Sequence, residues 1–295
     1  MHSTIRIGSR ESRLAVIQAE IIRAKIQKHH PEIAVELVTM KTSGDIILDR
    51  SLDQIGGKGL FVKELDQALR DERIDISVHS LKDMPMKIPA ELPILAYGKR
   101  EDPRDVMIYK PDRSEIPKDG VIGTSSRRRT IQMQALYPGC TFRSIRGNVQ
   151  TRLRKLETED YDGTVLAAAG LNRLGLSGVI GRIFAVEEVV PAAGQGILAI
   201  QGRAGEDDSW LECVNDPEST VQAAAERRFV TVLDGGCSSP IAAYARTSGN
   251  ELKLTGLYFR ESDETYYVES LTGNITEAAR LGEKLALEMQ QKWGC

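Results

Sequence analysis

The sequence predicts an α/β protein with two similar domains that face each other across a cleft, followed by a small α+β domain. Short apolar strands alternate with amphipathic helices over most of the chain, which is the pattern of a mostly parallel sheet. The pattern also repeats, because Val121-Ile122-Gly123-Thr124 resembles Ile5-Arg6-Ile7-Gly8: each short strand leads through glycine and hydroxyl residues into a helix. At 295 residues, the chain is long enough for two or three such domains.

The elements of the first domain follow from the hydrophobic periodicity. Residues 5–8, 35–39 and 74–79 are expected to be strands, and residues 12–27 and a segment that begins at residue 63 are expected to be helices. Ser9 or Ser12 can cap the first helix, because a serine hydroxyl accepts hydrogen bonds from the free backbone N–H groups of the first turn.

The rest of the chain continues this alternation and then changes. Strands are expected at residues 121–123, 162–166, 252–259 and 265–271, and helices at residues 221–233 and 276–293. Proline and glycine in residues 101–105 and 191–196 mark places where the chain passes between domains. We therefore expect domain one to contain residues 1–99 with about 194–215, domain two residues 100–193, and domain three residues 216–295.

The composition is that of an ordinary globular protein. Hydrophobic residues make up 41% and charged residues 27%, and no apolar run approaches the roughly 20 residues of a membrane span. The first residues lack the basic and apolar stretches of a secretory signal, so we expect a cytoplasmic protein with no membrane partner. The four cysteines, Cys140, Cys213, Cys237 and Cys295, are spaced too irregularly for a disulfide framework or a zinc site. No metal is expected, and any special cysteine must act alone.

The charge is unevenly distributed along the chain. The net charge of −3 and an aromatic content of only 5% argue against nucleic-acid binding. Residues 120–156, however, contain no acidic residue and eight basic ones: Arg127, Arg128, Arg129, Arg143, Arg146, Arg152, Arg154 and Lys155. Such a segment attracts an anionic ligand, although a solvated basic helix surface is the simpler interpretation.

Two predicted helices start directly after glycine-containing turns, at residues 9–12 and 124–129, and both turns place serine or threonine beside arginine. Free N–H groups, hydroxyl groups and guanidinium groups together can hold carboxylates, although N-capping alone also explains the hydroxyl residues. Asp83 follows a predicted strand, at the edge where open α/β sheets place their ligands. Among arginines it could stabilise a cationic intermediate, whereas a solvated loop acid is the simpler alternative.

Two glycine-rich segments remain. Residues 56–61 lack the spacing of a nucleotide-binding loop and suit either a mobile lid or a plain surface loop. Cys237 follows Gly235 and Gly236 in a turn that would expose its thiol, and Arg227 and Arg228 nearby would favour the thiolate. A buried, apolar cysteine is the alternative. No histidine lies near it in the sequence, so cysteine-protease chemistry is not indicated.

Taken in order, these segments resemble the hydroxymethylbilane synthase family, also called porphobilinogen deaminases, over essentially the whole chain. The matching segments are residues 7–12, 56–61, 79–85, 101–105, 123–129, 146–149, 169–175 and 235–237. The resemblance implies two domains of the type II periplasmic-binding-protein kind and a smaller third domain. It also implies a monomeric transferase that condenses four porphobilinogen molecules into the linear tetrapyrrole hydroxymethylbilane, with release of ammonia. The implied cofactor is a dipyrromethane held by a thioether to Cys237.

The same resemblance assigns roles to individual residues. Asp83 matches the catalytic acid. Cofactor binding is implied for Lys82, Asp83, Thr124, Ser126, Arg128, Arg129, Arg146 and Cys237. Substrate binding is implied for Arg10, Ser12, Ser80, Arg146, Arg152, Arg173 and Gln195, and membership of a lid for Lys58, Gly59 and Phe61. Each pyrrole carries two carboxylates, so a growing pyrrole chain would account for the arginines.

The chain departs from the family pattern at three places. Arg127 stands where the family commonly has an apolar residue, Ser238-Ser239 replaces the more frequent Gln-Val, and Gln201-Gly202 replaces a frequent Glu-Cys. These departures bear on local packing rather than on the acid or the cofactor-bearing atom. The rival hypothesis is a solute-binding or ligand-sensing protein for an organic polyanion. Such a protein usually carries an export signal and has no use for Cys237 on its glycine turn.

Overall fold

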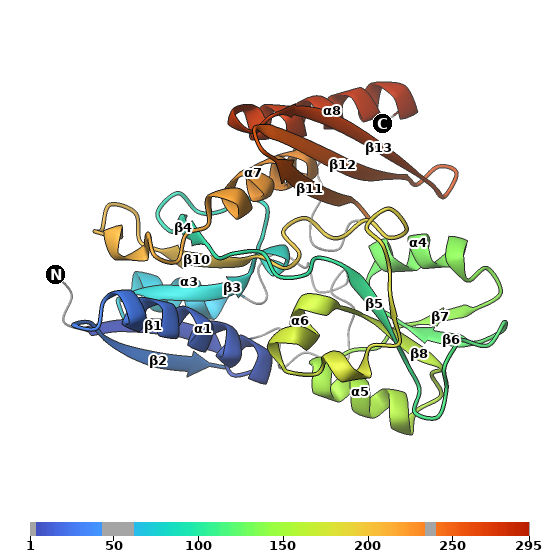
Figure 1. The fold of residues 1–295 in the computed structure, drawn as a ribbon, viewed down its shortest axis with the longest axis horizontal. Coiled ribbons are helices and arrows are strands. Elements are labelled where there is room, and N and C mark those ends of the chain that lie inside the picture. Colours follow the sequence, from blue (N-terminus) through green and yellow to red (C-terminus); the bar gives the residue numbers. More distant parts are fainter. Residues whose placement is uncertain (1–3, 43–61, 234–239, 295) are drawn as a thin grey trace.

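The computed structural model describes residues 4–42, 62–233 and 240–294. Two α/β units lie side by side, and a C-terminal unit of three strands and two helices lies against both (Figure 1). The predicted fold class, two similar α/β domains followed by a small α+β domain, is therefore confirmed.

The first sheet has the strand order β2-β1-β3-β10-β4. Its strands are β1 (Thr4–Arg10), β2 (Ala34–Met40), β3 (Ile76–Ser80), β4 (Ile94–Tyr97) and β10 (Leu198–Gly202). Strand β1 is parallel to β2 and β3, whereas β10 is antiparallel to both of its neighbours. Because β1 and β3 are parallel, their carboxyl ends meet at one edge of the sheet, where Arg10 and Ser80 end the two strands.

The second sheet, β7-β6-β8-β5-β9, repeats this arrangement. Its strands are β5 (Asp105–Tyr109), β6 (Val121–Gly123), β7 (Thr141–Arg143), β8 (Gly163–Ala167) and β9 (Arg182–Ile183). Strand β6 is parallel to β7 and β8, and β5 is antiparallel to β8 and β9. The two sheets correspond strand for strand, so the internal repeat seen in the sequence extends to the topology.

Strands β5 and β10 were not predicted, and each belongs to a chain segment that has just crossed from the other unit. Their residues are almost all buried, so they lack the alternation that identifies a half-buried strand. The two crossover segments lie side by side, because the Glu101 N–H donates to the Gly196 carbonyl oxygen at 3.1 Å. Gly196 has φ +91°, and a Cβ at this position would lie only 2.3 Å from the backbone oxygen of Glu101. The close contact between the crossovers therefore requires glycine here.

The described residues of the α/β units form the helices α1 (Arg13–His29), α3 (Lys63–Arg70), α4 (Arg127–Leu136), α5 (Val149–Thr158) and α6 (Ala168–Arg173). Short 3₁₀ helices are η1 (Leu81–Asp83), η2 (Ser177–Val179), η3 (Ser209–Leu211) and η4 (Ile275–Glu277). Of the two candidate caps of α1, Ser12 is the one used, since its Oγ accepts from the Ala15 N–H at 3.3 Å. The apolar face of α1 packs into the core of the first unit through Ile22 and Ile26. No helix in the described parts of the chain is both long and apolar enough to span a membrane.

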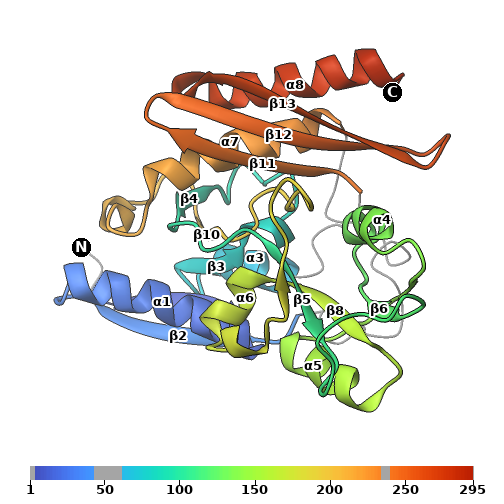
Figure 2. The same cartoon turned by 45° about the vertical axis from the view of Figure 1, so that its right-hand side comes forward.

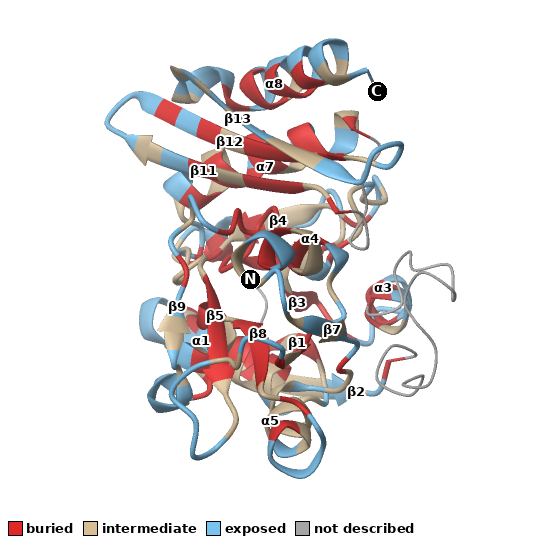
Figure 3. Ribbon diagram, turned by 90° about the vertical axis from the view of Figure 1, so that its right-hand side faces the viewer, coloured by how far each residue is buried: buried red, intermediate tan, exposed pale blue. Residues whose placement is uncertain are grey.

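The C-terminal unit is a three-stranded antiparallel sheet with two helices on one face (Figure 2). Its elements are α7 (Pro217–Val232), β11 (Ala242–Ser248), β12 (Glu251–Arg260), β13 (Thr265–Asn274) and α8 (Ala278–Trp293). Phe229, Leu254 and Leu285 lie in the core between sheet and helices, where Figure 3 shows buried segments facing each other. Helix α7 begins earlier than the predicted residue 221, because Asp216 caps it and Pro217 occupies its first turn.

A buried ion pair joins the C-terminal unit to the crossover. Arg100 Nη1 lies 2.6 Å from Glu226 Oε1, and Glu226 is fully buried. Arg100 Nε also donates to the Gln195 carbonyl oxygen at 2.9 Å. One arginine thus connects the crossover segments of the two α/β units to helix α7.

Candidate active site

Asp83 lies in η1, directly after the carboxyl end of β3, as predicted. Its side chain is exposed, while the neighbouring Lys82 is half-buried. Burial lowers the pKa of Lys82 to about 8; the charge of Asp83 opposes this shift and that of Arg129 adds to it. Lys82 Nζ donates to Gln195 Oε1 at 3.3 Å. An exposed carboxylate and a lysine that loses its proton easily therefore lie together at this edge of the first sheet.

Two of the predicted anion-binding arginines are buried against an acid. Arg128 and Arg129 lie in the first turn of α4 and are only 5% and 6% exposed. Arg128 Nη1 lies 2.7 Å from Asp105 Oδ2, and Arg129 Nη2 lies 2.8 Å from Asp105 Oδ1. Burial alone would raise the pKa of Asp105, but the two guanidinium charges outweigh it and hold that pKa well below its usual range. Gln195 Nε2 also donates to Asp105 Oδ1 at 2.9 Å, so both α/β units meet at this carboxylate.

Arg146 and Arg152 lie on either side of the start of α5. Arg152 Nε donates to the carbonyl oxygen of Gly147 at 2.8 Å. The pKa of Arg152 is lowered to about 10: burial is the main cause, the charges of Arg129 and Arg146 add to the shift, and the charge of Asp83 opposes it. These charges place Arg152 close to the other two arginines and to Asp83, and it stays protonated at neutral pH.

The hydroxyl groups predicted to contact a ligand form hydrogen bonds to nearby groups of the protein. Ser12 caps α1 and Ser126 caps α4. Thr124 Oγ1 accepts from the Ser126 N–H at 3.2 Å, and Ser80 Oγ accepts from Gln18 Nε2 at 2.9 Å. Capping alone therefore explains two of these residues, as the simpler interpretation held. Each hydroxyl that accepts a hydrogen bond still has its own O–H to donate.

Arg10 and Arg173 lie in different surroundings. Burial is the main reason that the pKa of His79 falls to about 4, and the charge of Arg10 nearby lowers it further. Arg173 ends α6 and donates to the Gly196 carbonyl oxygen at 2.6 Å. Burial lowers the pKa of Arg173 to about 10, and the charge of Glu101 opposes the shift. Arg173 therefore lies against the crossover segments, whereas Arg10 lies at the edge where β3 leads to the acid.

Some predictions fall on residues that the structure does not describe, namely Lys58, Gly59, Phe61 and Cys237. Arg127, which the sequence left out of the site, points toward the C-terminal unit. Its Nη2 lies 2.5 Å from Glu261 Oε2, and its guanidinium carbon lies 5.3 Å from the centre of the Phe259 ring. This contact accounts for an arginine where the family commonly has an apolar residue.

Three groups near the site were not predicted: Asp105 as an ion-pair partner, Gln18, and the pair formed by Arg100 and Glu226. Asp105 lies in a segment that matches the family, but nothing in the sequence links it to Arg129, 24 residues later. Gln18 lies among the apolar positions of the predicted helix 12–27, and a polar residue on that face was the available signal.

These residues combine positive charge with an exposed carboxylate. Lys82 and Arg152 are partly exposed cations near Asp83, and Arg146 is a partly exposed cation near Arg152. Such a set can bind a molecule rich in carboxylates and leaves Asp83 able to stabilise positive charge on it. The fold and the site define an anion-binding α/β protein in which both repeated units supply residues to one site.

Comparison with known proteins narrows this class. A family model described as "Porphobilinogen deaminase, dipyromethane cofactor binding domain" matches residues 5–211. A second, described as "Porphobilinogen deaminase, C-terminal domain", matches residues 220–291. The chain belongs to the porphobilinogen deaminase family.

Individual relatives agree with the family models. The porphobilinogen deaminase of Acetivibrio thermocellus is 53% identical over 285 residues, which cover 97% of each chain. That of Ruminiclostridium josui is 52% identical over 286 residues, again 97% of each chain. Among solved structures, the periplasmic aliphatic sulphonate binding protein SsuA from Escherichia coli has a TM-score of 0.41 at 12% identity, covering 79% of this chain and 71% of its own.

Proposed function

We propose that this chain condenses four porphobilinogen molecules head to tail into the linear tetrapyrrole hydroxymethylbilane and releases one ammonia for each. Its family supports the reaction, and one observation supports the location: the exposed Asp83 lies near Lys82, Arg129 and Arg152. Each pyrrole carries two carboxylates, so these cations attract both substrate and growing product. The solute-binding alternative is not supported, because models of an enzyme family match both regions of the chain.

The residues present fit a dipyrromethane, the cofactor for which the first matched domain is named. This group carries several carboxylates, and the described candidate residues include the partly exposed cations Lys82, next to Asp83, and Arg146, near Arg152. The residues that would hold the cofactor are Lys82, Asp83, Thr124, Ser126, Arg128, Arg129 and Arg146, with Cys237 as its covalent attachment. When bound, the cofactor supplies the pyrrole carbon to which the first substrate unit is joined.

Asp105 determines how Arg128 and Arg129 can take part. Both guanidinium groups are already paired with its carboxylate, so the three groups together contribute a net charge of +1. The remaining N–H groups of the arginines would face the ligand in a fixed orientation. Fixing them before a ligand binds reduces the entropy lost on binding.

Asp83 acts on the substrate. Loss of ammonia from the aminomethyl group leaves an electron-deficient pyrrole with positive charge, and a carboxylate near the ring nitrogen stabilises that charge. One such contact at about 4 Å is worth about 4 kcal/mol at an effective dielectric near 20, which is about a thousandfold in rate. We assign electrostatic stabilisation as the larger part of this role, with proton transfer as a second contribution.

The resemblance to the family assigns the remaining site residues. Substrate is bound or positioned by Arg10, Ser12, Ser80, Arg146, Arg152, Arg173 and Gln195, and a lid contains Lys58, Gly59 and Phe61. Gln195 is fully buried, so we assign it the positioning of Lys82 rather than a contact with substrate.

Domain one comprises residues 1–99 with about 194–215, domain two residues 100–193, and domain three residues 216–295. The chain acts as a monomer in the cytoplasm.

Intact-mass measurement tests the cofactor. Freshly purified protein should exceed the mass of its sequence by a dipyrromethane, whereas the Cys237→Ser variant should have the unmodified mass. An unmodified mass in a wild-type preparation that turns over porphobilinogen would contradict the covalent cofactor.

Single-turnover assays test the acid. Asp83→Ala should fold and bind porphobilinogen but release ammonia about a thousandfold more slowly, because the stabilising charge is lost. The matched control is Asp160→Ala, since the Asp160 side chain is 88% exposed in the second unit. Near-normal ammonia release from Asp83→Ala would remove this residue from the mechanism.

A further inference from the structure

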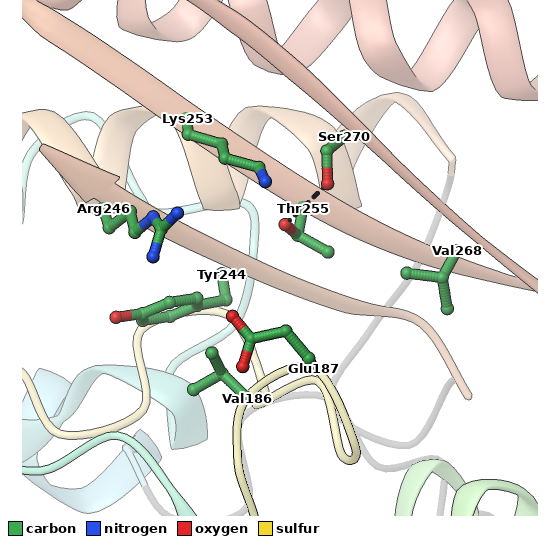
Figure 4. Close-up of a pocket in the computed structure, with 8 residues that line it drawn as sticks. All are labelled: Val186, Glu187, Tyr244, Arg246, Lys253, Thr255, Val268 and Ser270. Carbon is green, nitrogen blue, oxygen red and sulfur yellow. Dashed lines mark hydrogen bonds between the residues drawn. The ribbon is translucent and has the colours of Figure 1, made fainter.

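The three-stranded sheet of the C-terminal unit has one face that α7 and α8 do not cover. These helices pack on the face that carries Leu254. Side chains alternate along a strand, so Lys253 and its neighbours on the same face point the other way. A pocket of about 150 Å³ lies on that second face, between the strands and the loop that follows β9 (Figure 4).

Opposed charges line this pocket. Arg246 and Lys253 are direct partners across β11 and β12, and like charges in that position destabilise a sheet. Both side chains are exposed, and neither forms an ion pair with another described residue. Glu187 reaches the pocket from the facing loop. A bound carboxylate would relieve the repulsion between the two cations, and Glu187 would meet a positive group on the same ligand.

An aromatic ring and apolar side chains complete the pocket. Burial raises the pKa of Tyr244, so its ring is a neutral phenol at neutral pH; the charges of Arg246 and Glu187 also act on this group, which places both close to it. Val186 and Val268 add apolar surface. A volume of about 150 Å³ holds one small ring of the size of benzene, and an aromatic side chain favours a flat partner.

We propose that this pocket binds one molecule of the monopyrrole substrate at a second site, separate from Asp83. The identity of the ligand rests on the proposed function. Porphobilinogen carries two carboxylates for Arg246 and Lys253, an aminomethyl group for Glu187 and one flat ring for Tyr244. Two linked rings would exceed the pocket, so it selects the monomer over the growing chain.

Tyr244 also gives the pocket a route to the active site. The Arg100 guanidinium carbon lies 5.1 Å from the centre of the Tyr244 ring. Arg100 donates to the backbone of Gln195, whose side chain accepts from Lys82. Tyr244, on which the substrate would lie, is thus three contacts from Lys82, the lysine beside Asp83.

Titration calorimetry with porphobilinogen tests the pocket in the full-length chain. In the Asp83→Ala background, which suppresses turnover, we expect two classes of binding site. Adding Arg246→Ala and Lys253→Ala should weaken one class by at least about tenfold and leave the other unchanged. The matched control adds Arg280→Ala and Lys284→Ala, which remove two exposed cations of α8 and should keep both classes.

Equal stoichiometry and affinity in the two charge variants would overturn the second site. Thermal unfolding checks that each variant is folded, and Lys253→Gln alone supplies a milder change that should still weaken the same class of site. A failure of the proposed function would give a different result. The variant that lacks Arg246 and Lys253 would then not bind porphobilinogen at the remaining class of site, which is the proposed active site. Binding at a single class of site in every protein would contradict only the second site.

Discussion

Replacing Asp105 by asparagine should be one of the most destabilising single changes near the site. The carboxylate is fully buried between Arg128 and Arg129, whose side chains are 5% and 7% exposed. Asparagine can keep one oxygen for Arg129 and Gln195, but its NH₂ group then faces Arg128, and a buried guanidinium loses its counter-charge. Removing one partner of a buried ion pair costs about 3–5 kcal/mol, so thermal unfolding should begin roughly 6–12 °C lower.

The pH dependence of the stability difference between wild type and Asp105→Asn shows whether the charge of Asp105 causes it. The pKa of Asp105 is held below its usual range, so its contribution is present above the unfolded carboxyl pKa of about 4 and is lost as pH falls through the lower folded pKa. The difference in unfolding temperature between wild type and Asp105→Asn should be constant from pH 7 to about 5 and should become smaller below about pH 4. The control is Glu261→Gln, which breaks the exposed pair with Arg127 and should cost no more than about 1 kcal/mol. A cost for Asp105→Asn as small as the control's, or a gap that grows in acid, would refute this reasoning.

Three further predictions concern neighbouring positions. Lys82 should react with an amine reagent with a midpoint near its pKa of about 8, well below the roughly 10.4 of an unperturbed lysine side chain, and a midpoint near 10.4 would contradict the effect of its burial. Gly196→Ala should destabilise the protein by more than 1 kcal/mol in denaturant unfolding, because its Cβ would meet the Glu101 carbonyl oxygen; Gly178→Ala, where nothing lies within 4 Å, is the control and should be nearly neutral. Gly147→Ala should lower substrate affinity as well as stability, because Gly147 has φ +115° and its carbonyl oxygen positions Arg152; unchanged binding in a variant with reduced stability would show that the loop serves only folding.

The fold class was predictable because its signals are local. The first strand, its glycine and the helix after it occur twice in the sequence, and the two sheets have the same strand order. Strands β5 and β10 were not predictable in this way, since a strand buried on both faces shows no alternation and their places in the sheets depend on where the chain crosses. The short crossovers bring these strands into the opposite units, and hydrogen bonds such as that between Glu101 and Gly196 show in the structure that the crossovers touch.

The candidate site divides in the same way. The sequence identified Asp83 at the end of a predicted strand and a basic segment without acidic residues. Both features depend only on residues that are neighbours along the chain. The pairing of Arg128 and Arg129 with Asp105, and the turning of Arg127 toward Glu261, were decided only by the tertiary structure. The physical reason is that the state of a charged side chain depends on the groups within about 4 Å and on how far water is excluded. Spacing along the chain sets neither.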